Sequence, residues 1–258
     1  MTLKPYDVLA AVTYTTNYHH DRSWYLGHAW SLAVEEQFYL LWPFLVKYLG
    51  SRRAAWIALG TVVAAPVLRL GLMVRFSAFR PGIGETFPTV ADAIATGCLL
   101  ACYRGRLFEP SRSAARAVAL DGPLFWVVTV VGLAAAFQPS AKVDCLVGQS
   151  ATNLAIALVI ERVVRFPETP VGRFLNTRPL VFVGTLSYSL YLWQQPSLNR
   201  HSTALVSRFP LNVSLALICA LLSFYLVERP ALRLRSRLEK RVRQPDSSAV
   251  APAAVPHQ

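Results

Sequence analysis

The chain has 258 residues, of which 54% are hydrophobic and 16% are charged, and its mean hydropathy is +0.38. A soluble domain usually carries about 25% charged residues, so this chain has too few charges to cover a soluble globule of its length. The composition also excludes a disordered, collagen-like or coiled-coil chain, and four cysteines are too few for a disulfide scaffold. An integral membrane protein or an unusually apolar soluble domain remains.

The net charge is +12, from 26 Lys and Arg residues against 14 Asp and Glu residues. The basic residues lie between apolar runs and near the C-terminal end, and they do not gather on one polar face. This distribution is typical of a membrane protein with basic cytoplasmic loops, and we expect no nucleic-acid partner.

Seven apolar segments approach the length of about 20 residues that a membrane span requires. They are Ala29–Leu49, Ala54–Val74, Thr86–Tyr103, Ala119–Phe137, Cys145–Val164, Pro179–Pro196 and Pro210–Val227. Short polar connections such as Gly50–Arg53 and Arg165–Pro170 separate them and are typical of loops. The sequence therefore predicts an all-α, polytopic membrane helical bundle with about seven transmembrane helices.

The basic residues also predict the topology of this bundle. Most of them fall on the side of the membrane shared by the C-terminal tail, whereas Lys4, Arg22 and Arg69 are among those counted on the opposite side. The positive-inside rule then places the C-terminus in the cytoplasm and Met1 outside. Because no apolar leader follows Met1, we expect an odd number of helices to precede this chain.

The same pattern predicts three regions along the chain. Residues 1–28 form an extracytoplasmic segment or the end of a missing helix, and residues 29–229 form the transmembrane domain. Residues 230–258 form a cytoplasmic tail, which is basic as far as Arg243 and disordered beyond it. We expect the basic part to lie against anionic lipid headgroups.

A polar cluster begins the first predicted span. A charge inside a bilayer costs about 2.5–3.5 kcal/mol and tends to face the bundle interior. At 100° per residue, the carboxylates of Glu35 and Glu36 point to different faces, which argues against a paired-carboxylate device. Pro43 frees the carbonyl of Tyr39 and predicts a kink. Either glutamate could instead pair with an arginine near the headgroups, but the whole cluster beside a kink favours a site lined by Trp30, Ser31, Glu35, Glu36, Gln37 and Tyr39.

Asp92 is the second charge inside a predicted span. Thr89, Ala93 and Gly97 form a small-residue face beside it, which allows helices to approach closely. We expect Asp92 to meet an arginine or a backbone donor, and both structural pairing and contact with a substrate remain open.

Hydroxyl and amide side chains mark the sixth predicted span, and Glu228 marks the end of the seventh. Hydrogen bonds between helices, an interfacial aromatic belt and a site are alternative interpretations of the sixth span. Pro230 stops the last span directly after the charges of Glu228 and Arg229. The candidate site residues in this part are Ser187, Tyr188, Gln194 and Glu228.

No metal or nucleotide motif is present in the sequence. His19, His20, Asp21 and His28 cluster before the first span but match no metal-ligand spacing, so we expect no metal. The cysteines are isolated or lie in apolar runs, where they act as small hydrophobic residues.

The motif from His28 to Pro43, which reads HAWSLAVEEQFYLLWP, closely resembles the signature of the membrane acyltransferase-3 family. This family O-acylates surface glycans and related molecules. The resemblance covers most of residues 16–230. It includes four further segments, Thr16–Tyr18, Asp92–Ala101, Leu186–Trp193 and Leu226–Pro230.

The resemblance implies a ten-helix bundle in the bacterial cytoplasmic membrane, of which this chain would be the C-terminal, seven-helix part. It implies acyl-CoA as co-substrate, no bound cofactor, and a hydroxyl of a glycan or lipid-linked molecule as acceptor, with membrane lipids as further partners. The family's presumed catalytic His and its Arg-x-x-Arg pair belong to earlier helices, so the catalytic residues of this chain stay unknown. Gln194 and Gln195 stand where the family usually has His-Trp.

We therefore expect an N-terminally truncated acyltransferase that is inactive alone and that a three-helix N-terminal portion would complete. The alternative is a non-catalytic membrane module that binds a lipid or glycan, or that complements a separate N-terminal half. A small transporter is a third hypothesis, although no pair of broken helices in related halves supports it.

Overall fold

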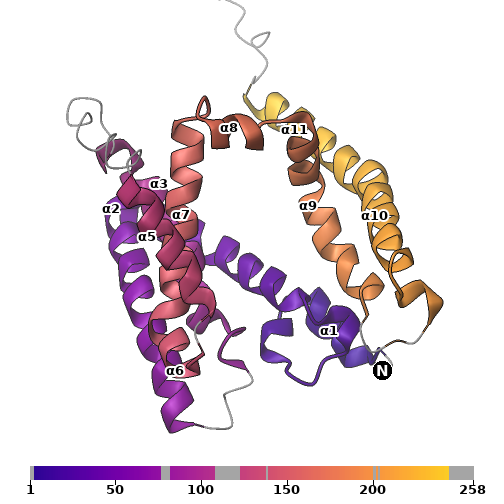
Figure 1. Ribbon diagram of the computed structural model, residues 1–258, viewed down its shortest axis with the longest axis horizontal. Helices are drawn as coiled ribbons and strands as arrows, with labels where there is room; N and C mark the ends of the chain where they lie inside the picture. Colours follow the sequence, from indigo (N-terminus) through magenta and orange to yellow (C-terminus); the bar gives the residue numbers. More distant parts are fainter. Residues whose placement is uncertain are drawn as a thin grey trace, which may run out of the picture. The chain divides into compact units, whose positions relative to one another are not determined.

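The computed structural model describes residues 3–76, 82–107, 123–137, 139–199, 202 and 204–243. Within these ranges the regular structure is helical and contains no strand, which confirms the all-α prediction (Figure 1). The chain divides into two compact units, Met1–Leu180 and Val181–Gln258. The start of the predicted span Ala119–Phe137 and the predicted disordered end of the tail lie outside the described residues.

The first unit begins with α1, Pro5–Val12, and two single 3₁₀ turns, Thr16–Tyr18 and Trp24–Leu26. Pro5 stands at the first position of α1, where its missing N–H costs no helical hydrogen bond. The segment then joins α2, Ala29–Arg75, which contains both of the first two predicted spans.

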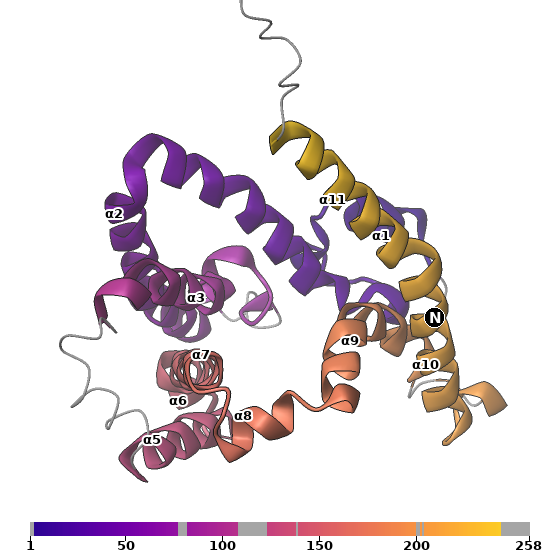
Figure 2. The same ribbon diagram turned by 90° about the horizontal axis from the view of Figure 1, so that it is seen from above.

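Helix α2 bends at Gly50, and Figure 2 shows its two halves running in different directions. Gly50 has φ 78° and ψ 159°, a backbone conformation that residues other than glycine rarely adopt. The prediction of a loop over Gly50–Arg53 is therefore wrong: the chain turns at Gly50 alone, and the helix resumes at Ser51. The helix runs on through Pro43, where the predicted kink stays a prediction, and the position with non-helical backbone angles is Gly50.

The second half of α2 packs against α3, Phe87–Leu107, and α3 packs against α7, Gln149–Arg165 (Figures 1 and 2). On its other side, α7 packs against α5, Pro123–Ala134. Helix α7 is preceded by the short α6, Ala141–Val143, and by a π-helical turn, Asp144–Gly148.

The α5–α7 pair is held together by small and cationic side chains. A Cβ added at Gly132 of α5 would lie only 2.7 Å from Cβ of Ala155 in α7. The guanidinium of Arg162 lies 5.3 Å from the ring centre of Phe125 and 5.1 Å from that of Trp126. Cation–π contacts of this kind gain strength when the cation is buried, as Arg162 is.

The end of the first unit carries α8, Pro170–Leu175, and the start of α9, Arg178–Ser197. The second unit continues with α10, Leu211–Ser223, a π-helical turn, Phe224–Glu228, and α11, Arg229–Arg243. Leu186 of α9, Ala220 and Phe224 form its buried core. The hydroxyl of Ser189 donates to Glu228 Oε2 at 2.9 Å and ties α9 to the end of that π-turn.

Three of the described helical segments are long and apolar enough to cross a membrane: Trp24–Arg75, Ala141–Arg165 and Leu211–Glu239. Phe87–Tyr103 and Phe125–Phe137 are shorter apolar helices. Seven spans are therefore not confirmed, and the number stays a prediction. Two causes are visible: α2 joins two predicted spans into one helix, and α9, the sixth predicted span, is rich in hydroxyl and amide side chains.

Candidate functional site

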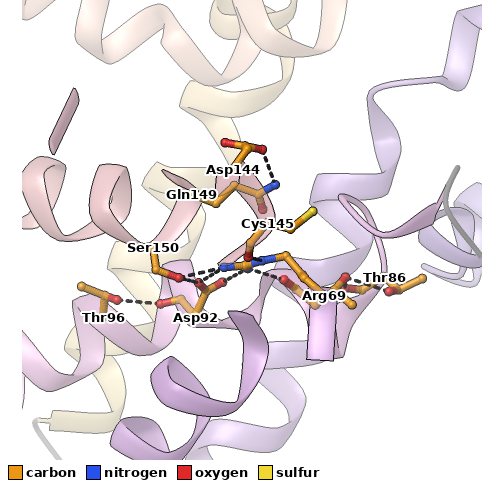
Figure 3. A network of polar contacts seen from close by, with 9 residues as sticks. Arg69, Thr86, Asp92, Thr96, Asp144, Cys145, Gln149 and Ser150 are labelled. Carbon is orange, nitrogen blue, oxygen red and sulfur yellow. Dashed lines mark hydrogen bonds and ion pairs between the residues drawn. The ribbon is translucent and has the colours of Figure 1, made fainter. Parts of the chain in front are cut away.

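A buried ion pair joins α2 to α3 in the first unit (Figure 3). Arg69 is 0% exposed and Asp92 is 1% exposed. The two terminal nitrogens of Arg69 each donate to one oxygen of Asp92, at 3.0 Å in both cases. This bidentate geometry is the strongest arrangement that the two groups can form.

Further hydrogen bonds extend this pair to α7. Arg69 Nη2 donates to Ser150 Oγ at 2.7 Å, and Ser150 in turn donates to Asp92 Oδ2 at 2.7 Å. Arg69 also donates to the carbonyl of Cys145 at 2.9 Å and to that of Thr89 at 2.6 Å. The five N–H donors of a guanidinium are thus all engaged.

The Arg69–Asp92–Ser150 network is therefore closed. It ties together α2, α3, α7 and the π-turn before α7, and Arg69 has no donor left for a phosphate or an oxyanion. The carboxylate of Asp92 already accepts three hydrogen bonds. Its remaining acceptor capacity therefore suits a role in orienting a ligand hydroxyl better than a role as the general base that removes the hydroxyl proton. The network therefore holds in place the side chains that line the neighbouring cavities.

A polar cavity of about 390 Å³ lies against Asp92. Gln149 donates to Asp144 Oδ2 at 3.1 Å on its wall, and Thr152 donates to the carbonyl of Gly132 at 3.1 Å. The amide of Asn153 has no hydrogen-bond partner in the described part of the chain. The described lining residues are Trp30, Gly84, Val90, Asp92, Ala93, Ala136, Asp144, Gln149, Thr152 and Asn153.

An apolar cavity of about 640 Å³ lies on the Ser150 side of the network. Trp56, Leu99 and Leu154 are typical of its lining, which α2, α3, α7 and the π-turn provide. Its hydroxyls at Ser150 and Thr96 are already committed, because Thr96 donates to the carbonyl of Asp92 at 2.7 Å. The hydrogen bond between Ser150 and Asp92 therefore separates an apolar space from a polar one.

Gln37 anchors the N-terminal segment to the start of α2. Its amide nitrogen donates to the carbonyl of Tyr14 at 2.8 Å and to Asn17 Oδ1 at 3.0 Å, and Asn17 Nδ2 donates back to Gln37 Oε1 at 3.2 Å. Asn17 is 0% exposed. Arg22 reaches the loop before α3, where its Nη2 pairs with Glu85 at 2.7 Å.

Asp7 closes the same segment on itself. The backbone N–H of Lys4 donates to Asp7 Oδ2 at 2.9 Å, and His19 Nε2 lies 2.8 Å from Asp7 Oδ1. The hydrogen bond from Lys4 holds the pKa of Asp7 below its ordinary value of 3.8; burial opposes this shift, and the hydrogen bond with His19 supports it.

We expect acid to loosen this N-terminal segment. Because the pKa of Asp7 is lower in the folded chain, its contribution to stability is complete above about pH 3.8 and is lost as the pH falls through the lowered value. Hydrogen exchange over residues 5–19, corrected for intrinsic rates, should show protection at pH 6 that disappears below pH 3.8. Asp7→Asn should already reduce protection at pH 6. Equal protection of both chains at pH 6 would contradict the role of Asp7.

The structure brings two of the predicted site residues together, since Trp30 and Asp92 line the same polar cavity. Asp92 meets Arg69, and an arginine was one of its two expected partners. Ser31 donates to the carbonyl of His28 at 3.3 Å. Glu35 and Tyr39 are exposed and Glu36 is half-buried. Neither glutamate makes a hydrogen bond or ion pair with a described residue.

The remaining predicted site residues lie in the second unit. Ser187 and Gln194 line another cavity, of about 460 Å³, which is mostly apolar. Tyr188 is exposed, and Glu228 accepts the hydrogen bond from Ser189.

Sequence reasoning missed Arg69, Asp144, Gln149, Ser150 and Asn153. The topology argument counted Arg69 as a loop residue outside the membrane, and this was wrong because Arg69 lies inside α2 and is buried. The cost of an intramembrane charge, already applied to Asp92, would have found it. The polar run Gln149–Asn153 in the fifth predicted span was the signal for Gln149, Ser150 and Asn153. Within the described residues, no group of three or more His, Cys, Asp or Glu side chains could hold a metal.

These features define a chain that is helical in its described regular structure, with helices long and apolar enough to cross a membrane and a buried polar network between two cavities. A sequence model of the acyltransferase-3 family, described as an acyltransferase domain, matches residues 2–229. The chain belongs to this family, which confirms the resemblance predicted from the motif at His28–Pro43.

Two curated relatives are similar to this chain. The O-acetyltransferase OatA of Staphylococcus aureus (strain NCTC 8325 / PS 47) is 26% identical over 211 residues, which cover 74% of this chain and 34% of that protein. The peptidoglycan O-acetyltransferase OatA of Listeria monocytogenes serovar 1/2a (strain ATCC BAA-679 / EGD-e) is 26% identical over 252 residues, 87% of this chain and 40% of that protein. The chain thus spans well under half the length of either relative. No solved structure matches the chain significantly.

Proposed function

We propose that this chain forms the acceptor-binding part of a membrane O-acyltransferase, which transfers an acyl group from acyl-CoA to a hydroxyl of a glycan or lipid-linked acceptor. Membership of the acyltransferase-3 family and the two O-acetyltransferase relatives support the reaction class. The observation that carries the proposal is the polar cavity beside the Arg69–Asp92–Ser150 network. By the positive-inside rule, the protein would be a multi-pass protein of the bacterial cytoplasmic membrane with its C-terminus inside.

The lining of the polar cavity suits a sugar. Asp144 can accept hydrogen bonds from hydroxyls, and the amide of Asn153 can both donate and accept. The ring of Trp30 can pack against the apolar face of a sugar ring. Its volume of about 390 Å³ falls in the range of about 300–1,000 Å³ that is usual for small-molecule sites.

The neighbouring apolar cavity suits the other half of the reaction. Apart from the engaged hydroxyls of Ser150 and Thr96 and the polar ends of Tyr103 and Trp56, its described lining offers only apolar side chains to a ligand. Such a lining fits the hydrocarbon part of an acyl group or of a lipid-linked acceptor. In this proposal Asp92 orients the acceptor hydroxyl between the two cavities. The general base and the groups that bind the CoA phosphates are assigned to none of these residues, because Arg69 is fully engaged.

Asn153→Ala is the sharpest test of acceptor binding. One lost hydrogen bond of about 1–1.5 kcal/mol should raise the KM for the acceptor roughly tenfold, with kcat little changed. The assay follows transfer of a labelled acyl group from acyl-CoA to glycan acceptors in bacterial membranes that contain the full chain together with the three-helix N-terminal portion that the family resemblance implies. Thr61→Ala is the matched control, because Thr61 is a half-buried residue whose hydroxyl donates to the carbonyl of Ile57 in its own helix, and it lines neither cavity. An unchanged KM in Asn153→Ala would overturn the placement of the acceptor.

The second candidate function is a non-catalytic module that binds a glycan or lipid, alone or with a separate three-helix portion. One observation favours it: the residues described around the polar cavity include no His, Cys or Lys that could act as base or nucleophile. It predicts saturable glycan binding to the full chain, lost in Asn153→Ala, without any acyl transfer from acyl-CoA. Co-purification of a second, three-helix polypeptide with this chain would show that the chain complements a separate N-terminal half.

A further inference from the structure

Helix α11 has one basic face and one apolar face. At 100° per residue, Arg229, Arg233 and Arg237 lie together on one side of the helix. Leu234 and Leu238, four residues apart, lie on a second face, whose centre is about 120° from that of the arginines. A helix with cations on one face and leucines on the other is typical of a segment that lies in a membrane interface.

The apolar face of α11 is exposed in the second unit. Leu234 is 59% exposed and Leu238 is 53% exposed. Arg235, on the flank between the faces, pairs with Glu239 at 2.8 Å, so it contributes little net charge. The basic face therefore takes its charge from Arg229, Arg233 and Arg237, and Lys240 falls on the same face in the sequence.

The position of α11 along the chain places it at the edge of the hydrocarbon layer. Helix α10, the π-turn and α11 follow one another without interruption over Leu211–Arg243, a rise of about 50 Å. The hydrocarbon core of a bilayer is only about 30 Å thick. The apolar stretch ends at Val227, so the span leaves the core where Glu228 is held by Ser189 and where Arg229 lies over the Tyr225 ring at 5.7 Å.

The junction between α10 and α11 has two features that allow a bend. The π-turn Phe224–Glu228 replaces the regular helical hydrogen bonds, and such turns are frequent at functional sites. Pro230 has no N–H, so the helical hydrogen bond to the carbonyl of Leu226 cannot form.

From this geometry we propose that α11 binds the headgroup layer of an anionic phospholipid bilayer. The chain bends at Phe224–Pro230, Leu234 and Leu238 enter the boundary with the acyl chains, and Arg229, Arg233 and Arg237 contact lipid phosphates. A second copy of the chain is a poorer occupant of this surface, because pairing two such helices brings like charges together. The inference does not depend on the proposed acyltransferase function.

The test places a polarity-sensitive dye on single cysteines of the full chain, at Leu238→Cys on the apolar face and at Arg233→Cys on the basic face, two positions about 140° apart around the helix. The four native cysteines are replaced by alanine, and each labelled chain is compared in nanodiscs of phosphatidylcholine with and without phosphatidylglycerol. We expect a blue shift and quenching by a lipid-phase quencher at position 238 only, increased by phosphatidylglycerol. Helix content measured by circular dichroism confirms that each variant is folded.

The variant R229Q/R233Q/R237Q, which removes three charges from the basic face, separates lipid recognition from simple insertion. Each basic residue near an anionic surface contributes about a fivefold factor, so the variant should lose roughly a hundredfold of the phosphatidylglycerol dependence. Three results would overturn the proposal: equal burial at positions 238 and 233, burial of position 238 that does not depend on phosphatidylglycerol, or burial in detergent accompanied by cross-linking of position 238 between two copies.

Discussion

Asp92→Leu is expected to destabilise the first unit by about 3–5 kcal/mol, because it leaves the charge of Arg69 buried without its partner. The double variant Arg69→Met with Asp92→Leu should regain most of this loss, since neither charge then remains in the apolar interior. Urea unfolding of the purified chain in detergent, followed by tryptophan fluorescence, measures both variants. Ser150→Ala, which removes one neutral partner from the same network, should cost about 1–3 kcal/mol.

Two results would contradict this account of the network. If the loss of stability in the double variant equalled the sum of the losses in Asp92→Leu and Arg69→Met alone, Arg69 and Asp92 would act independently and not as a pair. If Asp92→Leu were harmless, water would have to reach Arg69, which the burial of both side chains argues against. In either case the network would not fix the wall between the two cavities.

The sequence predicted the helical class of this fold because hydrophobic length depends only on local composition. It predicted Asp92 because a charge inside an apolar run is costly wherever the helix goes. The partner of Asp92 could not be chosen in the same way, since Arg69, Thr89 and Ser150 come together only when three helices pack. Arg69 was also hidden by an assumption, because an arginine near the end of a predicted span was counted as a loop residue.

Other misses have a similar physical cause. Gly50 and Pro43 both disfavour a regular helix, and their local propensities do not say that the backbone leaves helical angles at Gly50 while the helix continues through Pro43. Trp30 and Gln37 came from one motif, yet Trp30 lines the polar cavity whereas Gln37 binds Asn17 in the N-terminal segment. A motif marks a region of the fold, but the role of each residue in it depends on the neighbours that its side chain contacts.

Gly132→Ala is the substitution that should connect the packing of the first unit to its polar cavity. A Cβ there would lie 2.7 Å from Cβ of Ala155 and 3.2 Å from the carbonyl of Ala151, both on α7, and backbone cannot yield cheaply. Helix α5 would have to move away from α7, at a cost of about 1–3 kcal/mol. The same movement would lengthen the hydrogen bond from Thr152 to the carbonyl of Gly132, which lies on the wall of the polar cavity.

Gly60→Ala is the matched control, since a Cβ at Gly60 of α2 meets nothing within 4 Å. This variant should be neutral or more stable by up to about 1 kcal/mol, because alanine favours a helix over glycine. Urea unfolding and glycan binding to the full chain are measured for both. Gly132→Ala should lose stability and acceptor affinity together, whereas Gly60→Ala should keep both. A Gly132→Ala chain that loses stability but binds glycan normally would show that the α5–α7 contact supports the fold without shaping the acceptor cavity.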